Sequence, residues 1–248
     1  MYGHIFGWTN LPILSFHHAL GALGPLIASF LTTWIFLKKE GIKNLLAGCF
    51  QIKPLIYLVV ALFSPFILLV LAMVVSFFID KNPVNLSALL RIKEFPTFSL
   101  PIFFIYTLVF FGFGEEVGWR GFVLPRLQNK LNALTASVIL TVFWTLWHLP
   151  LFFYRPGYTT METSGIIGWV FSLLTGSILL TWLYNSSRAS ILICAVLHST
   201  IDIAFTADVV DKNVVKYMGV LITVWGILVI LIFKPRNLAV NAKALQKI

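Results

Sequence analysis

The chain has 248 residues, of which 59% are hydrophobic and only 11% are charged, whereas about 25% are charged in a typical soluble domain. Together with a mean hydropathy of +0.92, this composition excludes an ordinary soluble protein and indicates a chain that crosses the membrane several times. The net charge of +9 indicates contact with a lipid bilayer and no nucleic-acid partner. The basic residues lie in short loops and a C-terminal tail, and they form no strip interleaved with aromatic residues.

Seven apolar segments follow one another along the chain and predict transmembrane helices. They cover residues 11–37, 55–79, 98–124, 132–152, 165–185, 190–207 and 215–233. Because a segment in lipid must satisfy its own backbone hydrogen bonds, the predicted fold is all-α: a polytopic bundle of about seven spans around a polar intramembrane cavity. Gly24-Pro25 and Ser64-Pro65 predict kinks in the first two helices.

No soluble domain or flexible linker interrupts these segments, so we expect a single membrane domain in three parts. Residues 1–95 would hold two N-terminal spans, residues 96–233 a core, and residues 234–248 a basic cytoplasmic tail.

The distribution of lysine and arginine between the predicted loops indicates the orientation. Eleven basic residues lie on the side of the loop that follows the first segment: Lys38, Lys39, Lys43, Lys53, Arg126, Lys130, Arg188, Lys234, Arg236, Lys243 and Lys247. The opposite side has six: Lys81, Arg91, Lys93, Arg155, Lys212 and Lys216. This bias predicts a cytoplasmic C-terminus, an N-terminus outside, and an integral protein of the plasma membrane.

Six residues stand out because an ionisable group inside an apolar segment is costly unless it faces a polar cavity or a partner. They are Glu115, Glu116 and Arg120 in the third segment, His148 at the end of the fourth, and His198 and Asp202 in the sixth. Residues four apart share one face of a helix, so Glu116 is expected to pair with Arg120, and His198 with Asp202.

A depth count tests whether these residues can meet. At about 1.5 Å per helical residue, Glu115 lies roughly 16 Å and His198 roughly 15 Å from basic residues on the same side of the membrane, so the two should be level. His148 is level with them only if its helix begins near Ala136 or tilts strongly.

Such residues suit the activation of water. A carboxylate can take a proton from water while imidazoles orient it and polar groups stabilise an oxyanion. Two histidines and one carboxylate also form an established zinc site, although the spacing H-E-x-x-H is absent. Zinc and a metal-free mechanism are both open on these grounds.

Structural roles are the alternative for each group. The Glu116–Arg120 and His198–Asp202 pairs, and His148 alone, could be contacts between helices. Packing or interfacial positions are expected for His17, His18, Cys49, Cys194, Trp147, Trp182 and Trp225.

The three groups of residues resemble the motifs of the CPBP family of intramembrane proteases, which includes the CAAX prenyl endopeptidases and bacterial Abi-like proteins. Glu115, Glu116 and Arg120 match the motif E-E-x-x-x-R. His148 matches F-x-x-x-H, with Trp144 in place of phenylalanine, and His198 matches H-x-x-x-N, with Asp202 in place of asparagine. The resemblance covers residues 96–233. Members of the family usually have eight helices, so seven here would mean that a first helix is absent or that the start given is late.

The resemblance implies a protease core in which Glu115 is the general base on water and His148 assists it. Glu116 and Arg120 would support the cavity, while His198 and Asp202 would bind the oxyanion or a metal. Asp202 is a departure, since an ionised carboxylate cannot donate a hydrogen bond as asparagine does.

The leading hypothesis is therefore an intramembrane endopeptidase, with a cavity open to the cytoplasmic side, that cleaves a membrane-associated or lipidated protein or peptide. The alternative is a non-catalytic scaffold or bacteriocin-immunity-type protein that binds a peptide in the same cavity. A small transporter is less well supported, because no inverted repeat is visible.

Overall fold

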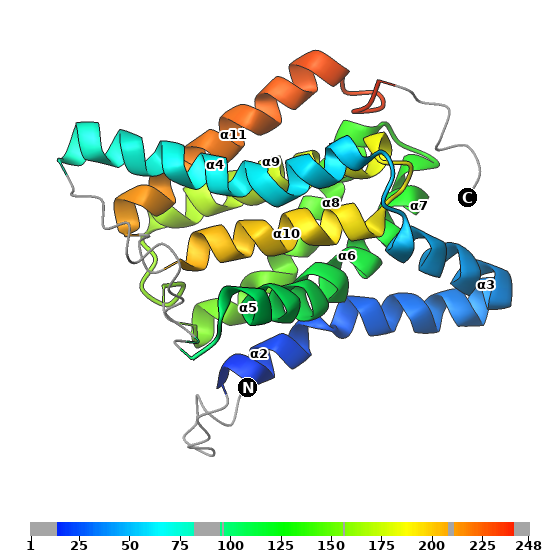
Figure 1. Ribbon diagram of the computed structural model, residues 1–248. Helices are drawn as coiled ribbons and strands as arrows, with labels where there is room; N and C mark the ends of the chain where they lie inside the picture. The colour runs from blue at the N-terminus through cyan, green and yellow to red at the C-terminus, as the bar shows by residue number, and fades with distance from the viewer. Residues whose placement is uncertain (1–13, 82–94, 96, 156, 208–210, 241–248) are drawn as a thin grey trace.

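The computed structural model describes residues 14–81, 95, 97–155, 157–207 and 211–240, and helices make up most of this part of the chain. Figure 1 shows the long helices lying side by side. The labelled helices are α2 (Leu14–Ala22), α3 (Gly24–Phe50), α4 (Leu55–Asp80), α5 (Leu100–Thr107), α6 (Gly114–Gly118), α7 (Leu124–Gln128), α8 (Ala133–His148), α9 (Thr163–Ser186), α10 (Ile191–Thr206) and α11 (Lys212–Phe233).

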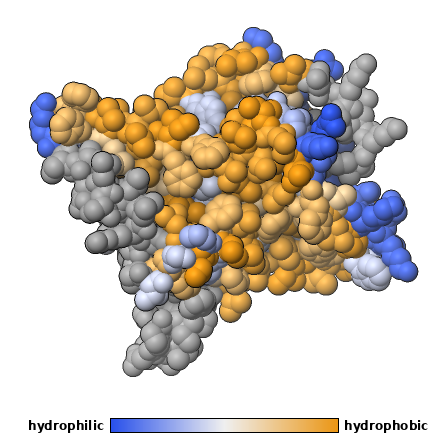
Figure 2. Space-filling view, viewed as in Figure 1, coloured by the Kyte–Doolittle hydropathy of each residue, from blue (hydrophilic) through white to orange (hydrophobic). Residues whose placement is uncertain are grey.

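The predicted all-α membrane bundle is confirmed. Six helical stretches among the described residues are long and apolar enough to span a bilayer: His18–Phe50, Leu55–Asp80, Leu100–Gln128, Ala133–Phe153, Thr163–Ser186 and Lys212–Phe233. With the shorter apolar helix α10 this makes about seven spans. Hydrophobic residues cover most of the face in Figure 2, and hydrophilic residues gather toward its two ends, as a bilayer requires.

Helix α10 is the centre of the bundle. It packs against α4, α5 and α9, and it is buried along most of its length, from Ile193 to Thr200. A membrane helix that is surrounded by other helices can carry polar side chains that would be too costly in contact with lipid. This explains why the sixth segment is both short and interrupted by His198.

The first predicted span differs from expectation at its far end. The helix breaks between α2 and α3 at Gly24-Pro25, as predicted, and breaks again at Lys38, whose φ is 53°. Residues after Lys38 were expected to form a loop, yet the chain remains helical to Phe50. Leu45 and Cys49 lie four residues apart on one face of this short helix, and both are buried against the bundle.

Pro65 lies inside α4, where its ring leaves the carbonyl of Ala61 without the usual backbone partner. The Thr200 hydroxyl of α10 donates to that carbonyl at 2.7 Å. The α4 helix continues through Pro65, and the freed acceptor becomes a bond between two helices.

The predicted basic tail begins as a packed segment. Leu238 is fully buried, and the carbonyls of Pro235 and Arg236 accept the backbone N–H groups of Leu134 and Ala133 at 3.0 Å each. These bonds satisfy the first amides of α8, which have no partner within the helix. The packed chain thus continues past residue 234, while residues 241–248 lie outside the described chain.

The third span is helical along its whole length, but two of its turns are π-helical and not α-helical. These turns are η2 (Leu108–Phe113) and η3 (Trp119–Val123), and they enclose the five residues of α6, which carry both glutamates. Wide turns of this kind are frequent at functional sites, and they change the direction of the side chains that follow.

Gly112 in η2 brings this span against α10. A Cβ atom there would lie 2.5 Å from Ser199 Oγ and 2.6 Å from the carbonyl oxygen of Ala195, closer than atoms can pack. Small residues commonly allow such backbone approach between membrane helices. The approach sets the distance at which Glu116 meets α10.

We therefore expect Gly112→Ala to lower the free energy of unfolding by about 1–3 kcal/mol, because the backbone of α10 must move to admit the methyl group. Thermal unfolding in detergent measures this. Gly176→Ala is the matched control, since a Cβ atom on Gly176 meets nothing within 4 Å. Equal unfolding temperatures for the two variants would contradict the steric argument.

Candidate active site

Glu116 joins the third span to α10. Its Oε1 accepts hydrogen bonds from Arg120 Nη1 at 2.9 Å and from His198 Nδ1 at 2.7 Å. The Glu116–Arg120 pair predicted from the spacing is therefore formed, and Glu116 has no exposed surface. The depth count, which put the third and sixth segments level, agrees with this contact.

Arg120 is completely buried as well. Besides Glu116 it donates to Ser177 Oγ of α9 at 3.3 Å, and its guanidinium lies 4.8 Å from the centre of the Trp144 ring. Glu116 Oε2 and Arg120 Nε have no partner among the described residues. The two buried charges therefore depend on each other for compensation.

Glu115 points to a different set of partners. Its Oε2 accepts hydrogen bonds from Trp144 Nε1 at 2.6 Å and from Trp119 Nε1 at 3.3 Å. Both bonds fall on one oxygen, and the residue is 4% exposed. The two adjacent glutamates therefore differ: Glu116 is enclosed in an ionic network, and Glu115 is held by neutral indole donors.

His148 reaches this group through Trp144. Its Nδ1 donates to the Trp144 carbonyl at 2.8 Å, which leaves Nε2 as the acceptor nitrogen of the neutral ring. The rings of both histidines pack against the Trp144 ring: the ring centre of His148 is 5.7 Å from that of Trp144, and the ring centre of His198 is 5.6 Å from it.

The predicted pairing of His198 with Asp202 is loose. Their closest atoms, Nε2 and Oδ2, are 3.7 Å apart, and the Asp202 side chain is 35% exposed. The short bond of His198 goes to Glu116, because the π-helical turn and Gly112 bring the third span close to α10.

The side chains do not form a recognisable metal site. Within the described residues, no three histidine, cysteine, aspartate or glutamate side chains converge on a common point. His198 Nδ1 already binds Glu116, and both indole donors occupy one oxygen of Glu115. The donor atoms therefore do not form the three-ligand set of a catalytic zinc site, and the choice between zinc and a metal-free mechanism stays open to test.

The site lies toward the end of the bundle opposite the C-terminal segment. His148 is the last residue of α8, Asp202 lies four residues before the end of α10, and both helices begin at the other end. The charge count assigns the end with His148 to the outside. The cytoplasmic C-terminus and the cytoplasmic opening of the cavity both stay predictions.

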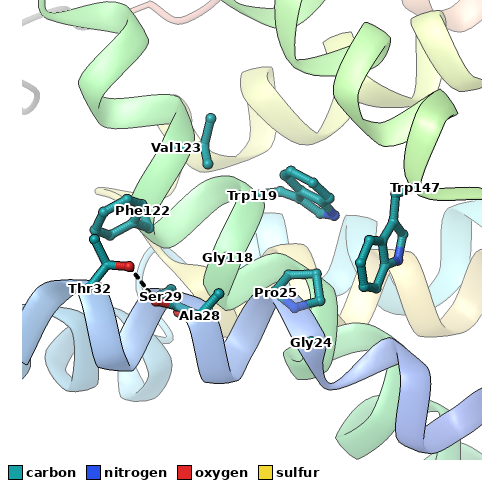
Figure 3. Close-up of a pocket in the computed structure, with 10 residues that line it drawn as sticks. All are labelled: Gly24, Pro25, Ala28, Ser29, Thr32, Gly118, Trp119, Phe122, Val123 and Trp147. Carbon is teal, nitrogen blue, oxygen red and sulfur yellow. Dashed lines mark hydrogen bonds between the residues drawn. The ribbon is translucent and has the colours of Figure 1, made fainter.

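An apolar groove of about 370 Å³ lies beside the site. Figure 3 shows Trp119 and Trp147 side by side at one end of it, with their ring centres 6.4 Å apart. The lining residues come from α3, from the α6–η3 region and from α8: Gly24, Pro25, Ala28, Ser29, Thr32, Gly118, Trp119, Phe122, Val123 and Trp147. Because Trp119 also donates to Glu115, one side chain connects the groove with the site.

Several contacts were missed from the sequence. Trp119 stands four residues after Glu115, the same spacing that identified Glu116–Arg120, and could have been found from it. Trp147, expected to be a packing residue, lines the groove. Trp182 and Trp225 pack on each other as expected, at 6.1 Å, and His18 lies 3.1 Å from the Tyr154 hydroxyl, apart from the acids. The side chain of His17 lies outside the described residues.

Comparison with known proteins agrees with the motifs. Residues 97–204 match the family model described as Type II CAAX prenyl endopeptidase Rce1-like. Over 114 residues the chain is 31% identical to CAAX prenyl protease 2 of Methanococcus maripaludis, an alignment that covers 44% of this chain and 41% of that relative. The match thus spans less than half the length of the relative. Residues 97–204, which contain all three motifs, are thus similar to this family of endopeptidases.

Proposed function

We propose that the protein is an intramembrane endopeptidase that hydrolyses a peptide bond of a membrane-associated or lipidated substrate with water activated by Glu115. The observation that carries the proposal is the state of Glu115, a carboxylate within a membrane span whose hydrogen bonds all fall on Oε2 in the described structure. A buried acid with one oxygen fixed and the other available is suited to act as a general base.

Glu115 is a better base than Glu116. Glu116 Oε1 is already bound to Arg120 and His198, and the residue is inaccessible to water. Its role is to hold these two partners, while Glu115 takes the proton.

The proton balance of the reaction is simple. Glu115 removes a proton from water as the water oxygen bonds to the carbonyl carbon, and the same proton passes to the leaving amine when the C–N bond breaks. His148, through Nε2, orients the water. His198, held by Glu116, donates from a protonated Nε2 to the developing oxyanion, and Asp202 beside that nitrogen orients it.

The groove suggests the kind of substrate. It lies at membrane depth beside Trp119, and its two hydroxyl groups bond to carbonyls of their own helix, so its surface is effectively apolar. An apolar chain attached near the scissile bond would fit there. The relative is named a CAAX prenyl protease, so a prenylated C-terminal peptide is the first substrate to test.

The function is tested with the purified full chain and internally quenched peptides that end in an S-farnesylated C-a-a-X sequence, alongside unlipidated copies. We expect cleavage of the farnesylated peptide. If protein shown to be folded cleaves none of these peptides, the proposal is contradicted.

The reaction is proposed to need no metal, because the donor atoms do not form a three-ligand set. Dialysis against a chelator should then leave the cleavage rate unchanged, as measured before and after with the same peptide. Loss of activity that returns on adding Zn²⁺ would show that the mechanism is metal-dependent.

A further inference from the structure

Trp144 contacts four of the six residues of the candidate site. Trp144 of α8 donates its indole N–H to Glu115, covers the guanidinium of Arg120, accepts at its carbonyl from His148, and packs edge-on against His198. It is 6% exposed, so these contacts are shielded from water.

The indole nitrogen is the unusual feature of this position. In the motif F-x-x-x-H the corresponding residue is phenylalanine, which is also aromatic but has no N–H group. The Trp144–Glu115 bond of 2.6 Å is therefore an addition that this chain makes to the motif.

The two indoles that bind Glu115 are not equivalent. Trp144 Nε1 is 2.6 Å from Oε2 and Trp119 Nε1 is 3.3 Å from the same atom, so Trp144 makes the closer bond. Hydrogen bonds to an ionised acceptor are the strong class, and their strength depends on short contact. Trp144 belongs to a different helix from Glu115, so its bond fixes the carboxylate relative to His148.

We propose that Trp144 is a positioning residue that holds Oε2 of Glu115 and so directs Oε1 toward the attacking water. The inference rests on the proposed function. Trp144 itself neither binds substrate nor transfers a proton.

The test is Trp144→Phe in the full-length chain, because phenylalanine keeps an aromatic ring at this position and removes the N–H donor. With the farnesylated peptide, kcat should fall roughly 10- to 100-fold, the effect of losing a hydrogen bond to a charged group, and KM should stay unchanged. A purely structural role would lower the yield or thermal stability of the protein and leave kcat per folded molecule intact.

Trp182→Phe is the matched control. Trp182 is also buried, but its Nε1 has no hydrogen-bond partner among the described residues, and it packs against Trp225 and Phe233 away from the acids. We expect kcat and KM of this variant to match the unmodified protein.

The outcomes separate the two proposals. If the unmodified chain cleaves the peptide and Trp144→Phe has the same kcat, the positioning role is wrong and the protease function stands. If the unmodified chain cleaves no peptide, the protease function fails and the positioning role fails with it. A fall in kcat equal to that of Trp182→Phe would also overturn the inference.

Discussion

Replacing Glu115 by glutamine should lower kcat by about 10²- to 10⁴-fold, the contribution expected of a general base, while the protein remains folded. Glutamine has the shape of glutamate, and its amide oxygen can still accept the indole N–H groups of Trp144 and Trp119. What it lacks is the ability to take a proton from water. The measurement is the cleavage rate of the farnesylated peptide together with thermal unfolding of the same preparation.

Glu40→Gln is a matched control for the loss of one carboxylate. Glu40 lies in α3 beyond the break at Lys38, it is exposed, and no contact links it to the site. We expect normal kcat for this variant. Full activity in Glu115→Gln would show that another group is the base and would remove the main support for the proposed mechanism.

The fold could be predicted because the bilayer leaves few alternatives. A run of apolar residues long enough to cross it must be helical, so hydropathy alone located the spans. The helix after Lys38 was missed because its apolar residues form only one stripe along it. The mean hydropathy over a window of sequence does not distinguish such a helix from a loop.

The site was predictable only in part. Regular helical spacing gave the Glu116–Arg120 pair, because both residues lie on one helix. It could not give the bond between His198 and Glu116, which depends on the π-helical turn at Leu108–Phe113 and on the space left by Gly112. A π-helical turn has no clear sequence signature, and it alters the direction of every side chain after it.

The role of Trp144 illustrates a second limit. At the sequence level the tryptophan was only a departure from a motif. The structure adds the direction of the indole N–H, which points at Glu115 from another helix. Hydrogen bonds between helices depend on rotation and register, which the composition of either helix does not determine.

The largest expected effect on stability is that of Arg120. Its guanidinium is the positive charge bound to the buried Glu116 carboxylate, and neither side chain is exposed. Arg120→Met fills most of the space but leaves that carboxylate without its ion-pair partner. Removing one member of a buried ion pair typically costs about 3–5 kcal/mol of the free energy of unfolding, and we expect a loss of this size.

A double-mutant cycle separates the charge effect from lost packing, because Glu116→Gln in the Arg120→Met background removes the unpaired charge. The double variant should therefore be more stable than Arg120→Met alone, and it keeps the test usable if the single variant does not fold. Arg126→Met, on the same span but exposed, is the control, and it should lose at most about 1 kcal/mol. Unfolding in detergent measures these three variants together with Glu116→Gln alone, which completes the cycle. If Arg120→Met and Arg126→Met were equally stable, the Glu116–Arg120 pair would not be the main support of the site, and the position of His198 would have to depend on the packing of α10 alone.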